Sequence, residues 1–278
     1  MALSGAILAS PVLAETPKRV VSMNLCTDQL AMLLADPEQL LSVSYIASDP
    51  RSSAMVQEAQ SYVANYGRAE EIYLMRPDLV LAGAYTSRAA VNMLMRLGVP
   101  VEVFQPASSM EDVQARMRQM GAALGQEPAA EDMVRDFDSR LEDLQVEAQH
   151  NPRALLYAAN GYTLGDQTLS GQILSAAGFD NAAVEAGYQF GGRMPLEILA
   201  MTAPDLVVSS GRYPGGSRSE EILDHPVVQA FRDAGDVATI TNRDWICGTP
   251  YVLRAVDSLR DARAALIAED LAAAEAAR

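Results

Sequence analysis

The sequence predicts an α/β fold of two Rossmann-like lobes with mostly parallel sheets, joined by a single long interdomain helix. Three observations support this fold. Short buried-strand patterns alternate with helical patterns, one long amphipathic helix interrupts the alternation near mid-chain, and a motif of the first half returns in the second. Alternating strands and helices indicate parallel sheets, because parallel strands need crossover connections. A chain of 278 residues is long enough for two such units.

Short apolar runs mark the predicted strands. They lie at 20–23, 41–45, 79–82 and 101–104 in the first half, and at 154–157, 206–209 and 237–240 in the second. Runs of this length bounded by polar or turn residues are typical of buried strands. A helix is expected over 28–35, and it ends before Asp36-Pro37 because proline disfavours the helical conformation of the residue before it.

The middle of the chain predicts one long helix, from Pro128 to Gln149. Its apolar residues recur every three or four positions, which makes one buried stripe on an acidic helix; they are Ala130, Met133, Val134, Phe137, Leu141 and Leu144. Such a helix would span roughly 33 Å and serve either as a rigid strut between lobes or as an ordinary surface helix. We therefore expect an N-terminal lobe over 15–125, an interdomain helix over 126–150 and a C-terminal lobe over 151–278.

An internal repeat supports the division into related lobes. Glu70 precedes Pro77-Asp78-Leu79-Val80, and Glu197 precedes Pro204-Asp205-Leu206-Val207 at the same spacing. In each copy the proline is expected to end a short helix, and the aspartate to cap the turn into a buried strand. Self-similarity of this kind predicts that the two halves fold alike.

The N-terminal residues indicate where the protein is located, and the net charge excludes one class of partner. Residues 1–14 carry no charged side chain and end in Ser10-Pro11-Val12-Leu13-Ala14, which fits a signal peptide remnant cleaved after Ala14 or, alternatively, a disordered tail. We expect an exported, periplasmic protein. A formal net charge of −15 argues against nucleic acid as a partner, because phosphate binding needs a basic face.

The candidate binding residues lie just after predicted strands or in the loops between elements, because ligands of parallel sheets bind beyond the carboxyl ends of the strands. Aromatic residues are only 6% of the chain, yet several fall there. Aromatic rings with a polar group suit a cleft that holds a large, partly apolar ligand; alternatively, each packs under its own loop. The candidates are Asn24, Cys26, Asp49, Arg51, Tyr66, Tyr85, Tyr162, Arg193, Arg212, Tyr213, Trp245 and Cys247.

Lys18 is the only lysine, so arginine must supply any cationic ligand recognition in the cleft. Arg193 and Arg212 are suited to carboxylate, phosphate or catecholate groups, although surface salt bridges are an equal alternative for both. Only two histidines occur, which excludes a three-histidine metal site, and we expect no bound metal ion.

From Lys18 onward the chain resembles the class III periplasmic substrate-binding proteins of ABC importers, in particular those for cobalamin and ferric siderophores. The resemblance rests on the opening strand after Pro17, on the two Glu…Pro-Asp-Leu-Val blocks, on the long central helix, and on Asp244-Trp245 followed by Pro250 and a terminal helix. It implies two lobes that hold a metal chelate between them, with small hinge motion and no resident cofactor. We expect the chain to act as a monomer.

The resemblance also implies roles for individual residues. Glu70 and Glu197 match the glutamates, one on each lobe, that dock onto arginines of the permease; alternatively, each is a solvated glutamate in the first turn of a helix. Trp245 matches a tryptophan in the cleft of the cobalamin-binding relatives, and Tyr66 lies near another of their cleft aromatics.

The two cysteines, Cys26 and Cys247, follow predicted strands on opposite walls of the crevice. Three states remain open: a disulfide across the lobes, two thiols that face a metal or metal chelate, or two unrelated buried cysteines.

The leading hypothesis is therefore a binding protein that captures a corrinoid or a ferric siderophore. Haem is an alternative ligand of the same class. The alternative from another class is a metallochelatase-like enzyme on a two-lobed scaffold, which needs a general base or metal ligands in the cleft. Gly-x-Ser-x-Gly, His-Glu-x-x-His and Gly-x-Gly-x-x-Gly motifs do not occur, and neither histidine follows a predicted strand. We therefore expect no enzymatic activity.

Overall fold

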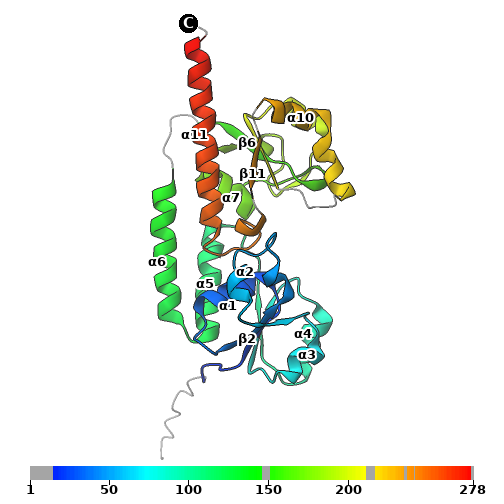
Figure 1. Ribbon diagram of the computed structural model, residues 1–278, viewed down its shortest axis with the longest axis vertical. Helices are drawn as coiled ribbons and strands as arrows, with labels where there is room; N and C mark the ends of the chain where they lie inside the picture. Colours follow the sequence, from blue (N-terminus) through cyan, green and yellow to red (C-terminus); the bar gives the residue numbers. More distant parts are fainter. Residues whose placement is uncertain (1–14, 146–150, 211–216, 235–236, 241, 277–278) are drawn as a thin grey trace, which may run out of the picture.

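The computed structural model describes residues 15–145, 151–210, 217–234, 237–240 and 242–276. Two α/β lobes lie one above the other, and long helices run along one side of both (Figure 1). The predicted α/β class with mostly parallel sheets is confirmed. The expected signal peptide remnant, residues 1–14, lies outside the described residues.

The N-terminal lobe is built on a five-stranded parallel sheet in the order β3-β2-β1-β4-β5. Its strands are β1 (Val20–Ser22), β2 (Leu40–Ser44), β3 (Val63–Asn65), β4 (Leu79–Gly83) and β5 (Val101–Phe104). Its helices are α1 (Leu25–Leu34), the 3-10 helix η1 (Tyr45–Ser48), α2 (Val56–Ala59), α3 (Ala69–Leu74), α4 (Arg88–Arg96) and α5 (Met110–Leu124).

The C-terminal lobe contains a four-stranded parallel sheet in the order β11-β10-β6-β8 and a small antiparallel pair, β7-β9. Its strands are β6 (Arg153–Leu156), β7 (Tyr162–Thr163), β8 (Asp180–Asn181), β9 (Gly192–Arg193), β10 (Leu206–Ser210) and β11 (Val237–Ile240). Its helices are η2 (Ala159–Gly161), α7 (Leu169–Ala176), α8 (Ala182–Glu185), α9 (Leu196–Thr202), η3 (Arg218–Asp224), α10 (Pro226–Asp233), η4 (Asn242–Asp244) and α11 (Val252–Ala276).

Every strand predicted from an apolar run is confirmed, with its ends within one residue of the expected positions. The short strands β3, β7, β8 and β9 were not predicted. They contain two or three residues each, several of them polar, which is too little for a hydrophobic pattern to show.

The helix that joins the lobes, α6 (Glu127–Leu144), is shorter than predicted. Gln145 already has an extended backbone, with ψ near 136°, so the expected continuation to Gln149 is wrong at this residue. The apolar stripe ends at Leu144, since the next positions on that face hold Glu147 and Ala148. Residues 146–150 lie outside the described part of the chain.

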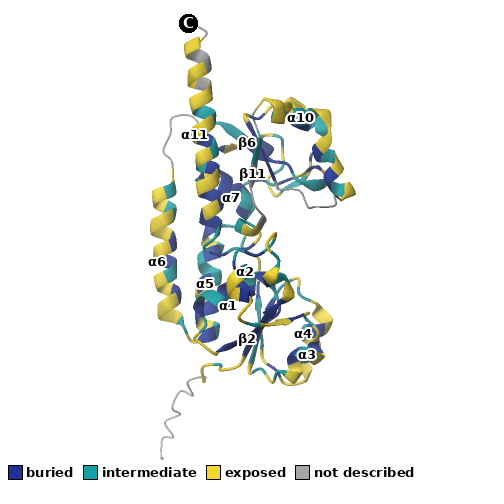
Figure 2. Cartoon of the chain, viewed as in Figure 1, coloured by how far each residue is buried: buried dark blue, intermediate teal, exposed yellow. Residues whose placement is uncertain are grey.

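The predicted stripe of α6 is buried against the rest of the protein. Ala130, Val134 and Phe137 are fully buried, and the other three members pack against the same core. α6 does not act alone, because it contacts both α5 and α11. Three helices, rather than one strut, therefore run beside the two sheets, and their inner sides are buried while their outer sides are exposed (Figure 2).

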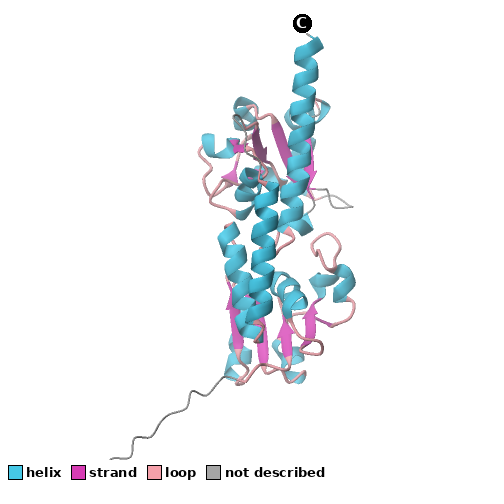
Figure 3. Cartoon of the chain, turned by 90° about the vertical axis from the view of Figure 1, so that its left-hand side faces the viewer, coloured by secondary structure: helices cyan, strands magenta, loops and turns pink. Residues whose placement is uncertain are grey.

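A single hydrophobic core extends through both lobes. One face of the N-terminal sheet supplies Val20 and Leu81 to it, and one face of the C-terminal sheet supplies Leu156 and Val208. The opposite faces form separate cores under α3 and α4 in one lobe and under α8, α9 and α10 in the other. Each lobe thus has an inner face that belongs to the common core and an outer face of its own; both sheets and the helices in front of them are visible in Figure 3.

The repeated Pro-Asp motif holds each outer helix onto its sheet. Asp78 accepts hydrogen bonds from the backbone N–H groups of Lys18 and Arg19, and Asp205 accepts one from the N–H of Arg153. The aspartates therefore bind the residues that lead into the neighbouring strand, β1 or β6, and the role expected for them, capping their own turn, is corrected.

The two arginines of this arrangement have equivalent contacts. The guanidinium of Arg19 donates to the carbonyls of Met75 and Arg76, at the end of α3. The guanidinium of Arg153 donates to the carbonyls of Thr202 and Ala203, at the end of α9. A positive charge at the C-terminus of a helix also interacts favourably with the helix dipole. Both outer helices are therefore held by the same arrangement, an arginine bound to the carbonyl groups at the helix end.

Among the described residues, no helix has both the length and the hydropathy that are needed to cross a lipid bilayer.

The packing of α5 on α6 leads to the first prediction. A Cβ atom at position 121 would lie 2.4 Å from the Cβ of Ala130, so Gly121→Ala forces these helices apart. Helix propensity alone would stabilise this variant by about 0.5–1 kcal/mol. We expect instead that overpacking lowers the free energy of unfolding by about 1–3 kcal/mol in urea denaturation. A variant as stable as the wild type would contradict the close approach.

Candidate functional site

Two pockets meet at Ile246, where the lobes come together. The first, of about 410 Å³, lies in the N-terminal lobe and is lined by Met23, Asn24, Leu25, Ser44, Tyr45, Ile46, Ser52, Tyr66, Gly67, Thr86, Ser87 and Ile246. The second, of about 390 Å³, is lined by Ala107, Ser108, Ala158, Leu164, Gln167, Thr168, Leu169, Ser170, Trp245 and Ile246. We refer to them as the N-pocket and the C-pocket.

The parallel sheet explains the position of the N-pocket. Met23, Tyr45 and Tyr66 follow the last residues of β1, β2 and β3, and these strands are neighbours in the sheet. Because the carboxyl ends of parallel strands meet at one edge, residues far apart in the sequence line one hollow.

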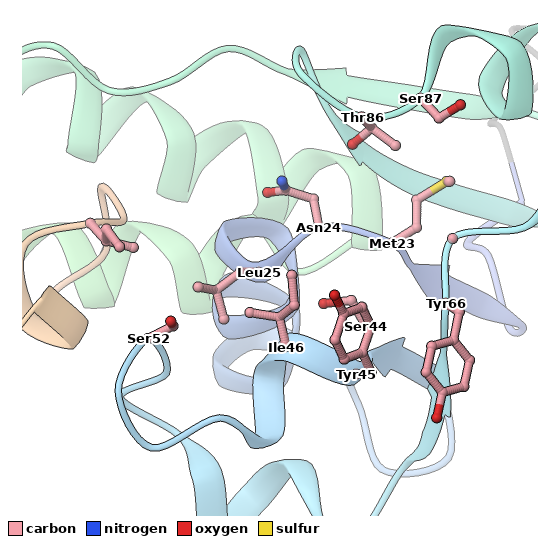
Figure 4. A pocket seen from close by; sticks show the side chains of 12 residues that line it. Met23, Asn24, Leu25, Ser44, Tyr45, Ile46, Ser52, Tyr66, Thr86 and Ser87 are labelled. Carbon is pink, nitrogen blue, oxygen red and sulfur yellow. The ribbon is translucent and has the colours of Figure 1, made fainter. Parts of the chain in front are cut away.

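Two tyrosines form an aromatic wall of the N-pocket. The rings of Tyr45 and Tyr66 are stacked, with centroids 5.1 Å apart and planes inclined by 22° (Figure 4). Tyr66 is 64% exposed although it lines the pocket, so its ring is available to a ligand. Stacked, accessible rings with hydroxyl groups suit a flat, partly apolar ligand.

Polar side chains form the other side of the N-pocket. Asn24 caps α1, since its side-chain oxygen Oδ1 accepts a hydrogen bond from the backbone N–H of Cys26. Its side chain and that of Met23 point to the same side, toward Thr86 and Ser87 (Figure 4). The amide of Asn24 and the hydroxyl groups of Thr86 and Ser87 can form hydrogen bonds and carry no charge.

The linings of both pockets are neutral. Their side chains are hydroxyl, amide, aromatic or aliphatic groups, and within the described part of the chain no Asp, Glu, Lys, Arg or His lines either pocket. Among the residues that the structure describes, no group of three or more His, Cys, Asp or Glu is arranged to hold a metal ion. The described lining groups can stack against a ligand and form hydrogen bonds with it.

A disulfide connects the lobes beside the pockets. Cys26, in the first turn of α1, is bonded to Cys247, which precedes α11. The Cα atoms are 5.1 Å apart, and the cysteines are separated by 221 positions in the sequence. Of the three states that the sequence left open, the structure has the bond across the crevice.

The segment around Cys247 is packed tightly onto the N-terminal lobe. A Cβ atom at position 248 would lie 2.2 Å from the Cβ of Ala107, so only glycine allows this approach. Cys247 itself is buried in the common core. The disulfide and this contact hold Ile246 in place where the two pockets meet.

The predicted site residues fall into several groups. Asn24 and Tyr66 line the N-pocket, and Trp245 lines the C-pocket. Tyr85, Tyr162 and Arg193 are exposed and lie outside both linings. Arg212 and Tyr213 are outside the described residues, so their role in binding stays a prediction.

Asp49 and Arg51 bind each other. The guanidinium of Arg51 donates to both carboxylate oxygens of Asp49, over 2.9 and 3.0 Å. Hydrogen bonding by Arg51 holds the pKa of Asp49 below its usual value. This arginine is therefore neutralised by a neighbouring residue, and neither side chain lines the two pockets.

Sequence reasoning missed most of the residues that line the two pockets, and three of them show why. Tyr45 and Met23 were assigned to the ends of strands, whereas β2 ends at Ser44 and β1 at Ser22, so both are the first residues beyond their strands. Ile246 lies between two residues that were selected. An exposed isoleucine carries no signal for binding by itself.

The two glutamates of the repeat occupy equivalent, exposed positions. Glu70 lies in the first turn of α3 and Glu197 in the first turn of α9. Both helices belong to the outer layers of their lobes. No hydrogen bond or salt bridge to either carboxylate is found within the described part of the chain. The expected docking role stays a prediction.

One buried carboxylate lies directly behind the N-pocket. Asp28 is fully buried in α1 and accepts hydrogen bonds from the backbone N–H and the hydroxyl of Ser44, which lines the pocket. Burial raises the pKa of Asp28 to about 6, and hydrogen bonds from Ser22 and Ser44 offset only part of this effect.

The sequence matches a known protein family and several individual proteins. The family described as periplasmic binding protein matches residues 20–240. A cobalamin-binding protein of Halobacterium salinarum is 25% identical over 202 residues, which cover 71% of this chain and 55% of that protein. The chain thus matches little more than half the length of this relative.

Solved structures share the fold. A possible iron-binding periplasmic protein from Staphylococcus epidermidis has a TM-score of 0.74 at 17% identity, covering 89% of this chain and 99% of that one. A periplasmic heme-binding protein from Roseiflexus sp. RS-1 has a TM-score of 0.72 at 20% identity, covering 88% and 99%.

The buried carboxylate predicts a pH dependence of stability. Because the pKa of Asp28 is higher in the folded protein than the ordinary value of 3.8, the folded state holds this proton more tightly. Its contribution to the free energy of unfolding therefore falls as the pH rises from about 4 to about 6, and it is constant above. Relative to wild type, Asp28→Asn should gain about 3 kcal/mol over this window.

Denaturation in urea at several pH values measures this difference. The variant Asp36→Asn, which removes an exposed carboxylate, is the matched control. Parallel curves for wild type and Asp28→Asn between pH 4 and 7 would show that burial does not act on this group.

The disulfide predicts a large effect of its removal. Replacing both cysteines, Cys26→Ala with Cys247→Ala, should lower the free energy of unfolding by about 2–4 kcal/mol, because a long closed loop restricts the unfolded chain. Reduction of the wild-type protein should have a similar effect. Two thiols that react with an alkylating agent in the native, unreduced protein would exclude the bond.

Proposed function

Because the chain belongs to the periplasmic binding protein family, we propose that it is the solute-binding component of an ABC importer and that it carries a corrinoid between its lobes. The observation that supports this choice of ligand is that the described linings of the N-pocket and the C-pocket are neutral and include three aromatic rings, Tyr45, Tyr66 and Trp245. A corrinoid has a broad, largely apolar ring system surrounded by amide groups. It needs stacking surfaces and neutral hydrogen-bonding groups more than it needs a counter-ion.

Other ligands of the class fit this lining less well. Ferric catecholate siderophores are strongly anionic and haem carries two carboxylates, and such groups are commonly bound by arginine. Within the described residues, the linings contain no arginine, and Arg51 is paired with Asp49. A ferric siderophore is therefore the second choice within the same mode of action.

Haem is the alternative that one observation favours. Tyr66 presents an accessible phenol at the N-pocket, next to the ring of Tyr45. Tyrosine is one of the side chains that ligate haem iron. If haem is the cargo, its absorption spectrum in the complex should change in Tyr66→Phe, because the variant lacks the hydroxyl that would bind the iron. A corrinoid contains no iron, so the absorption spectrum of a bound corrinoid should stay the same in this variant.

We propose that the protein works in an oxidising compartment outside the cytosol and delivers its ligand there to a membrane permease. Glu70 and Glu197 are rigidly placed, exposed carboxylates on the two lobes, suited to orient the protein on arginines of the permease. The disulfide supports an exported, periplasmic protein, because such bonds persist outside the reducing cytosol. We propose a monomer without resident cofactor; the chelate is cargo, and nucleic acid is not a partner.

The proposal assigns no catalysis to the cleft. A metallochelatase needs ionisable groups at the metal, and within the described chain both linings contain only neutral side chains. The relatives that match are named as binding proteins, in agreement with this assignment.

Fluorescence titration tests the ligand. Trp245 is the only tryptophan and lines the C-pocket, so a bound metal chelate should quench its emission. We expect saturable quenching by cyanocobalamin, weaker or no quenching by haemin and by a ferric tris-catecholate, and a higher melting temperature at saturating cyanocobalamin. At 100 times the Kd, binding adds about 2.7 kcal/mol to the stability.

Two variants complete this test. Tyr66→Ala should weaken cyanocobalamin binding at least about tenfold, since aromatic contacts dominate many interfaces. Tyr73→Ala, on the outer helix α3, is the matched control. Tight binding of haemin or the ferric catecholate, with no response to cyanocobalamin, would overturn the corrinoid assignment; no response to any chelate would overturn the proposed function.

A further inference from the structure

The repeat that places Glu70 and Glu197 also places a second pair of side chains. Leu74 follows Glu70 by four positions, and Met201 follows Glu197 by four positions. Residues four apart lie on the same face of a helix, about 5–6 Å from each other. Each outer helix therefore presents one carboxylate and one apolar side chain on a single face.

Both apolar side chains are almost entirely in solvent. Leu74 is 80% exposed and Met201 is 81% exposed. One exposed apolar residue on a surface is common and needs no explanation. Here the same exposure recurs at the same point of the repeat in both lobes, while the inward residues of the two helices, Ile72 and Leu199, are fully buried.

The helices hold these pairs in a fixed geometry. Each helix ends in a left-handed residue, Arg76 with φ of 52° after α3 and Ala203 with φ of 43° after α9. Arg19 and Arg153 bind the last carbonyl groups of the two helices. The backbone that carries these side chains therefore loses little further freedom on binding.

The N-terminal copy borders a hollow. A pocket of about 530 Å³ lies beside α3 and is lined by Tyr73, Leu74, Arg76, Pro77 and Val99. α3 and α4 form the side of this lobe that faces away from α6 (Figure 1). In the C-terminal copy the neighbour of Met201 is Ala200, so the N-terminal copy offers the larger apolar surface.

We propose that docking uses a two-part contact on each lobe: Glu70 with Leu74, and Glu197 with Met201. The inference rests on the proposed function, because the occupant is the permease of the importer. Its matching surface presents, twice, an arginine beside an apolar recess about one helical turn away. The ion pairs steer and orient the encounter, and the apolar contacts retain the complex.

Binding of the purified protein to its cognate permease complex in lipid nanodiscs tests this. Leu74→Ser and Met201→Ser should each weaken docking about tenfold, mainly through faster dissociation, with the larger effect at Leu74. Glu70→Gln and Glu197→Gln should slow association and reduce its dependence on salt. Leu271→Ser, which changes an equally apolar, 63% exposed residue on α11, should dock like wild type.

The outcomes separate the two proposals. If the glutamine variants dock poorly but Leu74→Ser and Met201→Ser dock like wild type, the apolar part of the contact is wrong and the proposed function stands. If all four variants dock like wild type, docking through this surface is wrong altogether. An equal loss for Leu271→Ser would show a nonspecific effect and overturn the inference. Cyanocobalamin titration should be the same for all variants, because their sites lie away from the cleft.

Discussion

Both parallel sheets bury one face in the same hydrophobic core, and this constraint determines how the lobes are related. Val20 and Leu81 from one sheet, Leu156 and Val208 from the other, and the inner sides of α5, α6 and α11 belong to one cluster. Pulling the lobes apart would expose this shared apolar surface, at about 25 cal/mol for each Å². Large separation of the two lobes is therefore disfavoured.

The outer faces of the two sheets are covered and fixed by a different set of contacts. Each is covered by more than one helix, and one helix of each set, α3 or α9, is tied to the first strand of its sheet by one aspartate and one arginine, Asp78 with Arg19 and Asp205 with Arg153. The ends of the sheets and their outer faces are thus separate surfaces. A ligand at the first and a protein partner at the second do not compete for the same residues.

The fold was predictable from the sequence because apolar runs set the strands and the Pro-Asp repeat set their equivalence. The cleft was predictable only in part. Whether Met23 and Tyr45 lie inside a strand or just beyond it depends on the exact last residue of that strand, and the hydrophobic pattern placed both of these strand ends one residue too far along the chain. The mutual pairing of Asp49 with Arg51 depends on a loop conformation, and the disulfide on which sulfurs meet in space, since sequence does not specify connectivity.

The disulfide also changes the covalent topology of the chain. Because Cys26 and Cys247 lie near opposite ends of the sequence, the bond closes almost the whole of both lobes into one ring and leaves α11 as an attached arm. A single peptide bond cleaved anywhere inside this ring yields two fragments that remain one molecule. Both walls of the cleft therefore stay on the same covalent body after a proteolytic cut.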